Sequence, residues 1–153
     1  MTPPFQTQFK FYGVYPLPWW GLQTSATLQL LPGPSSGGLP GSITASYVAT
    51  NAEIKPSLGR DLASGANGTA TVELLRPFTM LGEYAKQLDV RFSKSFKVGQ
   101  VRLRGTLDIY NLLNTSSVQT LNTRLSSSGA NLWQQPTQIL QARYFQFGTQ
   151  IDF

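Results

Sequence analysis

Hydrophobic and polar residues alternate along several segments of the chain, as they do in a β-strand whose two faces meet different surroundings. In residues 88–96 the even-numbered positions are hydrophobic, apart from Lys94, and the odd-numbered positions are polar. The same alternation recurs in residues 101–110 and 145–153, and more weakly near the N-terminus. The pattern predicts five strands, at about residues 5–15, 22–31, 84–96, 100–112 and 139–153.

The connections between these strands alternate in length. Short turns join the first strand to the second and the third to the fourth, whereas residues 32–83 and 113–138 form long connections. Strands of about ten residues joined in this way are typical of outer-membrane β-barrels, which have short periplasmic turns and long extracellular loops. We therefore expect an all-β fold made of antiparallel transmembrane β-barrel strands, with both long loops extracellular.

The alternation also assigns each strand residue to a face. The expected lipid-facing residues are Leu88, Val90, Phe92, Leu103, Leu107, Ile109, Phe147, Ile151 and Phe153. The expected lumen-facing charges are Asp89, Arg91, Arg102, Arg104 and Asp108. With a two-residue turn within residues 97–99, Arg91 would lie opposite Arg104 and diagonal to Asp89. Lys94 is the exception on the lipid face, two residues from that turn, where a lysine can extend its ammonium group to the interface.

The composition restricts the possible chemistry. The 153 residues include no Cys and no His, which excludes disulfides, thiolate or imidazole metal sites and imidazole-dependent catalytic triads. Charged residues make up 12% of the chain, about half of the usual share in a soluble domain. Asp89, Asp108 and Asp152 could supply a carboxylate pair for acid/base chemistry, but lumenal ion pairs explain them better. We expect no enzymatic activity, no metal and no cofactor.

Two other interpretations fit part of the pattern. A soluble antiparallel sandwich also alternates with period two, but the long loops would leave it a thin core. Aromatic residues also gather at the strand ends, as they do in membrane-interface girdles: Tyr15, Trp19, Trp20, Phe96, Tyr110 and Tyr144. A sheet that binds single-stranded nucleic acid is disfavoured because the arginines and most aromatic residues fall on opposite faces, so no nucleic-acid partner is expected.

The C-terminal residues 146–153, with the sequence QFGTQIDF, form the most specific motif. They resemble the signal by which the outer-membrane barrel-assembly machinery recognises a final strand, and the matching residues are Gln146, Gly148, Ile151 and Phe153. A strand with a free edge and an apolar, aromatic-ended face can pair with that machinery and then close a barrel. The resemblance implies the assembly machinery and outer-membrane lipid as partners.

Longer stretches are also distinctive: residues 87–96 (QLDVRFSKSF), 102–105 (RLRG), 108–114 (DIYNLLN), 15–19 (YPLPW) and 45–51 (ASYVATN). Together they resemble the C-terminal barrel region of TonB-dependent receptors, most closely those with a carboxypeptidase-regulatory-like N-terminal domain. The resemblance is strongest over residues 84–153. It implies a 22-stranded barrel with an N-terminal plug, located in the bacterial outer membrane. Such receptors import scarce ligands with energy delivered through TonB.

The same resemblance implies that the five strands belong to a larger barrel. The plug, the TonB-contacting segment and the signal peptide of such receptors are absent from these residues, so we expect a C-terminal fragment that depends on TonB through the missing plug. Four loop residues are candidates for ligand contact: Tyr47, Tyr84, Arg124 and Trp133. A passive porin or an adhesion barrel is the alternative function for the same strands, and the transported ligand is not specified.

Overall fold

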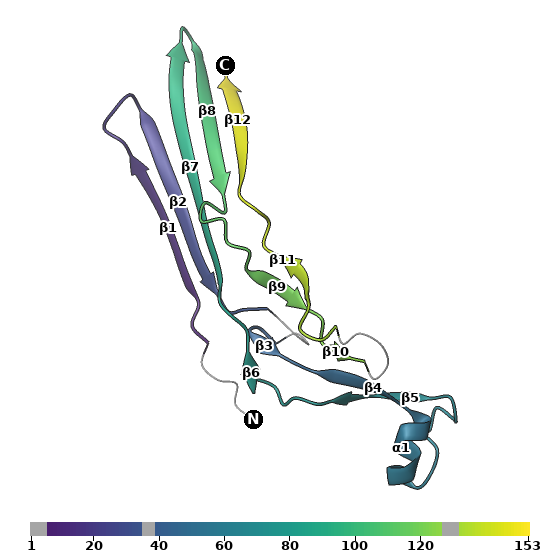
Figure 1. The fold of residues 1–153 in the computed structure, drawn as a ribbon. Coiled ribbons are helices and arrows are strands. Elements are labelled where there is room, and N and C mark those ends of the chain that lie inside the picture. The colour runs from purple at the N-terminus through teal and green to yellow at the C-terminus, as the bar shows by residue number, and fades with distance from the viewer. Residues whose placement is uncertain (1–5, 35–38, 127–131) are drawn as a thin grey trace. The chain divides into compact units, whose positions relative to one another are not determined.

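The computed structural model describes residues 6–34, 39–126 and 132–153. It is mostly β with one short helix, and it divides into two compact units (Figure 1). We call the first the sheet unit; it consists of Thr7–Pro32, Tyr84–Ser117 and Leu140–Phe153. The second, the loop unit, contains Gly33–Glu83 and Val118–Ile139.

The sheet unit is a five-stranded antiparallel sheet in the order β1-β2-β7-β8-β12. Its strands are β1 (Phe9–Pro16), β2 (Leu22–Leu31), β7 (Ala85–Val98), β8 (Val101–Tyr110) and β12 (Tyr144–Asp152). The expectation of a mostly β fold with antiparallel sheets is confirmed. Among the described residues these strands do not close into a barrel, because β1 and β12 each pair with one strand only.

The turn between β7 and β8 lies later in the chain than the sequence analysis placed it. Val98 pairs with Val101, so the turn consists of Gly99 and Gln100, and Gly99 adopts a φ of 62°. A left-handed glycine is favoured in two-residue hairpin turns because it matches the twist of the flanking strands. Lys94 therefore lies five residues before Gly99, and the expectation that it lies two residues from the turn is wrong.

The later turn also changes the cross-strand partners. Arg91 pairs with Asp108, and Arg104 pairs with Ser95, so the expected Arg91–Arg104 pairing is wrong. The partner of Arg91 moves by four residues, which is an even number. Because side chains alternate with period two, an even shift leaves every residue on the face expected for it.

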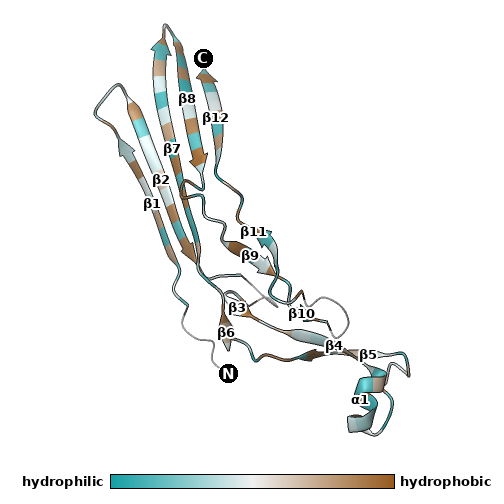
Figure 2. Ribbon diagram, viewed as in Figure 1, coloured by the Kyte–Doolittle hydropathy of each residue, from teal (hydrophilic) through white to brown (hydrophobic). Residues whose placement is uncertain are grey.

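The register places hydrophobic residues in continuous rows across the sheet. Cross-strand partners share a face, and the rows include Phe11–Leu28–Leu88 and Phe92–Leu107–Phe147. We call this side the apolar face and the opposite side the polar face. Figure 2 shows the resulting alternation of hydrophobic and hydrophilic residues along the five strands. The polar face includes Lys10, Tyr12, Gln23, Ser25, Thr27, Gln29, Gln87, Asp89, Arg91, Ser93, Arg102, Arg104, Thr106, Asp108, Gln146, Gln150 and Asp152.

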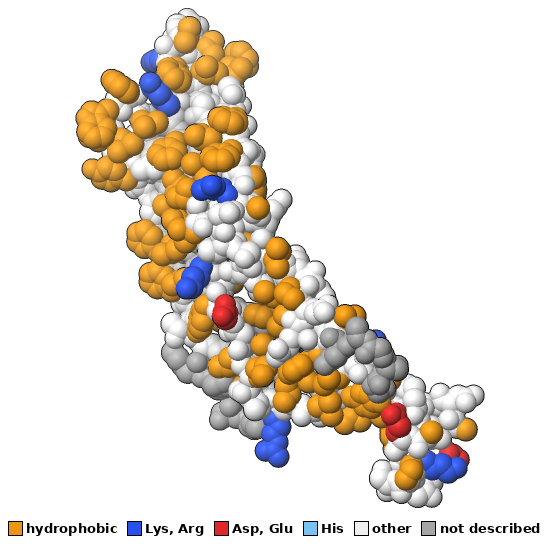
Figure 3. All heavy atoms as spheres, viewed as in Figure 1, with side chains coloured by type: hydrophobic (Ala, Val, Ile, Leu, Met, Phe, Trp, Pro, Cys, Tyr) orange, Lys and Arg blue, Asp and Glu red, His pale blue; other side chains and the backbone are white. Residues whose placement is uncertain are grey.

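Within the described ranges, the sheet unit has no hydrophobic core of its own. Its described residues include no buried aliphatic or aromatic side chain, whereas Asp108 and Asn111 are buried. On the apolar face Phe145 is 58% exposed and Phe147 is 79% exposed. In Figure 3 hydrophobic side chains cover most of the visible face of the five-stranded sheet. The hydrophobic residues of the sheet thus point outward rather than into a core.

Asn111 ties together three segments at the end of the sheet where β8 stops. It has a φ of 50°, and its side-chain amide donates to the carbonyls of Thr115 (2.9 Å) and Gln141 (2.8 Å). Its side-chain oxygen accepts the Thr115 N–H, and its own N–H donates to the Asp89 carboxylate at 2.8 Å. The buried side chain therefore has its polar atoms paired and links the end of β8 to the segment before β12, and the backbone N–H links it to β7.

The loop unit has secondary structure of its own, so the two long connections are not irregular loops throughout. Three small sheets, β10-β4-β5, β11-β9 and β3-β6, and a capped helix α1 form it. The β10–β4 pair is parallel. Ile43, Ala45 and Ala49 are its buried hydrophobic residues among those described. The elements are β3 (Ser42–Ile43), β4 (Ser46–Thr50), α1 (Asn51–Leu58), β5 (Thr69–Glu73), β6 (Met80–Leu81), β9 (Val118–Leu121), β10 (Arg124–Leu125) and β11 (Pro136–Ile139).

Helix α1 was not expected from the sequence. It begins after Thr50 with a capping box, in which the Glu53 carboxylate accepts the Thr50 backbone N–H at 2.8 Å, and it ends at Gly59, which has a φ of 71°. It is eight residues long. In the part of the chain that the structure describes, no helix has the length and hydrophobicity needed for a membrane span.

We expect Asn111→Ala to lower the free energy of unfolding by about 2–4 kcal/mol, because it removes buried hydrogen bonds. Alanine is also less favourable than asparagine at this positive φ, since it has no polar side chain to hydrogen-bond locally. Asn111→Gly separates the two effects, since glycine tolerates the backbone conformation but cannot replace the hydrogen bonds. Urea unfolding followed by circular dichroism measures both. Equal stability of the wild type and both variants would show that Asn111 does not hold the strand ends together.

Candidate functional site

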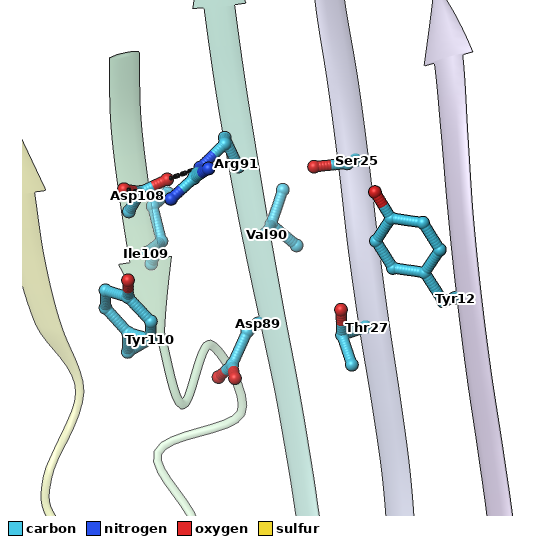
Figure 4. A pocket seen from close by; sticks show the side chains of 9 residues that line it. All are labelled: Tyr12, Ser25, Thr27, Asp89, Val90, Arg91, Asp108, Ile109 and Tyr110. Atoms are coloured by element: carbon cyan, nitrogen blue, oxygen red, sulfur yellow. Dashed lines mark hydrogen bonds and ion pairs between the residues drawn. The ribbon is translucent and has the colours of Figure 1, made fainter. Parts of the chain in front are cut away.

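A depression on the polar face is a candidate site. It has a volume of about 220 Å³ and is formed by β1, β2, β7 and β8 (Figure 4). Its lining residues are Tyr12, Ser25, Thr27, Asp89, Val90, Arg91, Asp108, Ile109 and Tyr110. Three of the five expected lumen-facing charges, Asp89, Arg91 and Asp108, therefore lie together.

The Arg91–Asp108 ion pair is the strongest electrostatic contact in this depression. Arg91 Nε and Nη2 each donate to one Asp108 carboxylate oxygen, and the Nη2–Oδ2 distance is 3.0 Å. The Asp108 side chain is only 7% exposed, whereas that of Arg91 is 54% exposed. Two parallel hydrogen bonds compensate the desolvation of the carboxylate. The outer side of the guanidinium group remains accessible from the depression.

Asp89 stabilises the strand end rather than pairing with an arginine. Its carboxylate accepts hydrogen bonds from Gln87 Nε2 at 2.9 Å and from the Asn111 backbone N–H at 2.8 Å. These bonds couple one wall of the depression to the Asn111 hydrogen-bond network. Among the described residues, the side chains of His, Cys, Asp and Glu form no group of three or more that could hold a metal ion.

The other two expected charges lie nearer the β7–β8 turn, on the same face. Arg104 Nε lies 3.4 Å from Ser95 Oγ, and Arg102 is the cross-strand partner of both Lys97 and Asp152. All five charges share the polar face, but they do not form a single cluster.

Hydroxyl groups supply most of the remaining polar atoms of the depression, and they were not among the site residues expected from the sequence. Tyr12 is 68% exposed on β1, and Ser25 and Thr27 come from β2. The Tyr110 ring stacks on Tyr144, with 4.6 Å between ring centroids. The alternation along β1 could have assigned Tyr12 to the polar face, because the hydrophobic residues beside it in the strand lie on the apolar face. Together with Arg91, these groups can hydrogen-bond to a polar ligand or polypeptide segment.

The four residues of the expected barrel-assembly signal lie on or beside β12, an edge strand of the sheet. Gln146 and Gly148 belong to the polar face, as partners of Asp108 and Thr106, and Ile151 belongs to the apolar face. A Cβ atom at Gly148 would lie 2.6 Å from Thr106 Oγ1, so a larger residue there would displace the Thr106 hydroxyl. Phe153 is fully exposed.

The four expected ligand-contacting loop residues are divided between the two units. Tyr47 and Arg124 lie on the paired strands β4 and β10, and the Tyr47 hydroxyl donates to Glu53 Oε1 at 2.6 Å. Trp133 Nε1 donates to the Thr44 carbonyl at 3.1 Å. Tyr84 belongs to the sheet unit and is 44% exposed.

Two carboxylates with lowered pKa values hold helix α1 and the segment after it. The Tyr47 hydroxyl, followed by the backbone and side chain of Thr50, lowers the pKa of Glu53. The Asn51 amide, followed by Lys55 at 3.1 Å, lowers the pKa of Asp61. In both cases the charged carboxylate accepts the hydrogen bonds, which favours ionisation.

The comparisons with known proteins give no match: no family model, no curated protein and no solved structure is similar to the chain.

We expect Arg91→Ala to destabilise the sheet by about 1–3 kcal/mol, because it leaves the nearly buried Asp108 carboxylate unpaired. Replacing both residues by Leu should recover part of that loss, since no charge is then buried. Arg104→Ala, at an exposed position, should change the stability by less than about 0.5 kcal/mol. A double-mutant cycle of Arg91→Leu, Asp108→Leu and their combination, measured by urea unfolding, gives the coupling, and additive single effects would show that the pair contributes nothing.

The segment after α1 should lose stability in acid. Because the folded-state pKa values of Glu53 and Asp61 lie below their ordinary values of 4.5 and 3.8, their stabilising contribution is present above those values. It is lost as the pH falls through the lowered folded-state values. Hydrogen exchange of the Leu62 amide, which donates to Asn51 Oδ1, reports this change after correction for the intrinsic rate. Asp61→Asn should weaken the pH dependence, and an unchanged profile would contradict the assignment.

Proposed function

We propose that the sheet unit is part of the wall of an outer-membrane β-barrel, with its apolar face toward lipid and its polar face toward the lumen. We further propose that this barrel belongs to a TonB-dependent receptor for active uptake of a scarce ligand. The observation that supports the barrel is a continuous hydrophobic face with no hydrophobic core behind it among the described residues: the buried residues of the sheet unit are Asp108 and Asn111.

The amount of exposed hydrophobic surface favours lipid over water. Five phenylalanines of the apolar face are 44–79% exposed: Phe9, Phe11, Phe96, Phe145 and Phe147. At about 150–250 Å² for each ring, these five alone expose on the order of 500 Å². Soluble monomers rarely expose a continuous apolar patch of more than a few hundred Å². Aliphatic residues in the rows between these rings extend the patch.

The length of the uninterrupted apolar segment on β7 supports the same assignment. On the apolar face, Leu88, Val90 and Phe92 lie between Lys86 and Lys94, with no other charge among them. The two lysines are eight residues apart, which is about 26 Å along a strand. A strand tilt of about 40° reduces this to about 20 Å along the membrane normal, and lysine side chains can extend the remaining distance toward an apolar band of about 25 Å.

The free edges of the sheet support a larger barrel. Outside their one pairing each, β1 and β12 present unpaired backbone groups beside an exposed apolar face. In lipid such groups must be satisfied by further strands, because no water is available to hydrogen-bond with them. Closure by additional strands, to the 22 that the resemblance implies, would satisfy both edges.

The receptor function rests on the resemblance and on the polar face. The depression around Arg91 offers a half-exposed guanidinium and several hydroxyls, which are suited to a plug segment or a polar ligand in the lumen. The loop unit would lie on the extracellular side and present Tyr47, Arg124 and Trp133. Energy would reach the receptor from TonB through a plug, and barrel assembly would use the signal on β12.

Single-cysteine labelling tests the two faces directly, because the chain has no native Cys. In phospholipid vesicles, we expect Arg91→Cys to react with a water-soluble maleimide much faster than Val90→Cys or Phe92→Cys. The physical reason is that adjacent strand residues alternate between water and lipid. Labelling of the unfolded chain in urea controls for intrinsic reactivity. Equal rates at the three positions in the folded chain would contradict a membrane-facing apolar surface.

A further inference from the structure

Lys94 is a cation within the apolar face of the sheet. Its Nζ atom lies 4.7 Å from the ring centroid of Phe96 and 5.6 Å from that of Trp20. Trp20 lies in the β1–β2 turn with a φ of 55° and is 84% exposed. The ammonium group is therefore within cation–π distance of two aromatic rings at the height of this turn.

The cross-strand row that contains Lys94 is less hydrophobic than the rows beside it. It runs Leu22–Lys94–Gly105–Thr149, whereas the two neighbouring rows are Phe96–Leu103–Ile151 and Phe92–Leu107–Phe147. A Cβ atom added at Gly105 would meet no other atom within 4 Å. The row therefore has an open space over Gly105 on β8, with Lys94 of β7 on one side and Thr149 of β12 on the other.

The ammonium group has no anionic partner in the part of the chain that the structure describes. The two ion pairs found there are Lys55–Asp61 and Arg91–Asp108, and no residue of the apolar rows is acidic. Cation–π contacts offset only part of the cost of placing a charge against lipid. A membrane phospholipid can supply the missing anion, because its phosphate lies where the turn end of a barrel meets the interface.

We propose that Lys94 binds the phosphate group of a phospholipid in the leaflet at the turn end of the sheet. An acyl chain of that lipid lies in the space over Gly105, between the rows of aromatic and aliphatic side chains. Trp20 and Phe96 orient the ammonium group toward the headgroup. This inference rests on the proposed membrane location of the sheet, and it adds a specific lipid site to it.

Quenching of tryptophan fluorescence by brominated lipid tests the site. The full chain carrying Trp133→Phe retains Trp19 and Trp20, both beside the β1–β2 turn. It is refolded into phosphatidylcholine vesicles that contain a minor share of phosphatidylglycerol with brominated acyl chains. We expect the local preference for phosphatidylglycerol to fall by about fivefold in Lys94→Gln, which is the effect of one lysine near an anionic surface.

Two matched variants control the measurement. Lys86→Gln removes a lysine from the same face of the same strand, eight residues away, and should leave the preference unchanged. Lys94→Arg keeps the charge and should retain most of the preference. An excess of inorganic phosphate should not reduce the quenching, and a reduction would overturn the assignment to a lipid in favour of free phosphate.

The outcomes distinguish this inference from the function on which it rests. If brominated lipids quench all variants but the preference is the same in Lys94→Gln and the wild type, the lipid site is overturned and the membrane location stands. If brominated phosphatidylcholine and phosphatidylglycerol quench none of the variants, the membrane location itself is overturned.

Discussion

The structure of the sheet unit depends on its cross-strand register. Each strand has one hydrophobic and one polar side, but the sheet has a continuous hydrophobic face only if neighbouring strands are paired so that their hydrophobic sides coincide. A register shift of one residue would place the hydrophobic side of one strand beside the polar side of the next. In all four strand pairings the hydrophobic sides coincide, so hydrophobic residues from the five strands form continuous rows. This register separates the two faces and forms the depression on the polar face. It also places Lys94 among the hydrophobic residues.

A few residues with special backbone or packing requirements fix the register. Gly99 allows the two-residue turn that sets β7 against β8, and Asn111 fixes the other end of β8 through its side-chain hydrogen bonds. Gly148 allows β12 to approach Thr106 on β8. None of these residues belongs to the apolar rows. The hydrophobic pattern specifies which face a residue takes, and the turns and hydrogen-bonded ends specify which residue it pairs with.

This division explains how much of the fold could be predicted. Alternation is a local signal, so the strands and the faces of Asp89, Arg91, Arg102, Arg104 and Asp108 were predictable from the sequence. The partner of Arg91 was not, because Val98 and Val101 continue the alternation through the hairpin and only Gly99 marks its turn. Helix α1 has no apolar stripe, and its sequence signals are only the capping box between Thr50 and Glu53 and the glycine at its C-terminal end, Gly59.

The loop unit was the least predictable part for a related reason. Its strands are two to five residues long, and β4 pairs with β10, which lies far along the chain. Such short segments carry too little alternation to define a face, and non-local pairing has no sequence signal of its own. The same limit applies to the depression on the polar face. Tyr12 contributes to it only because the register brings β1 within reach of β7 through β2.

The two faces of the sheet make opposite demands on their surroundings. Backbone hydrogen bonds within the sheet are equally satisfied in water or in lipid, so they do not select between the two. The side chains do select: burying the apolar rows contributes about 25 cal/mol for each Å² removed from water, whereas transferring the polar face into lipid would desolvate unpaired arginines. A sheet with both requirements needs apolar surroundings on one face and water on the other. Each face also carries one charge with a specific contact: Asp108 pairs with Arg91 on the polar face, and the Lys94 ammonium lies near the rings of Trp20 and Phe96 on the apolar face.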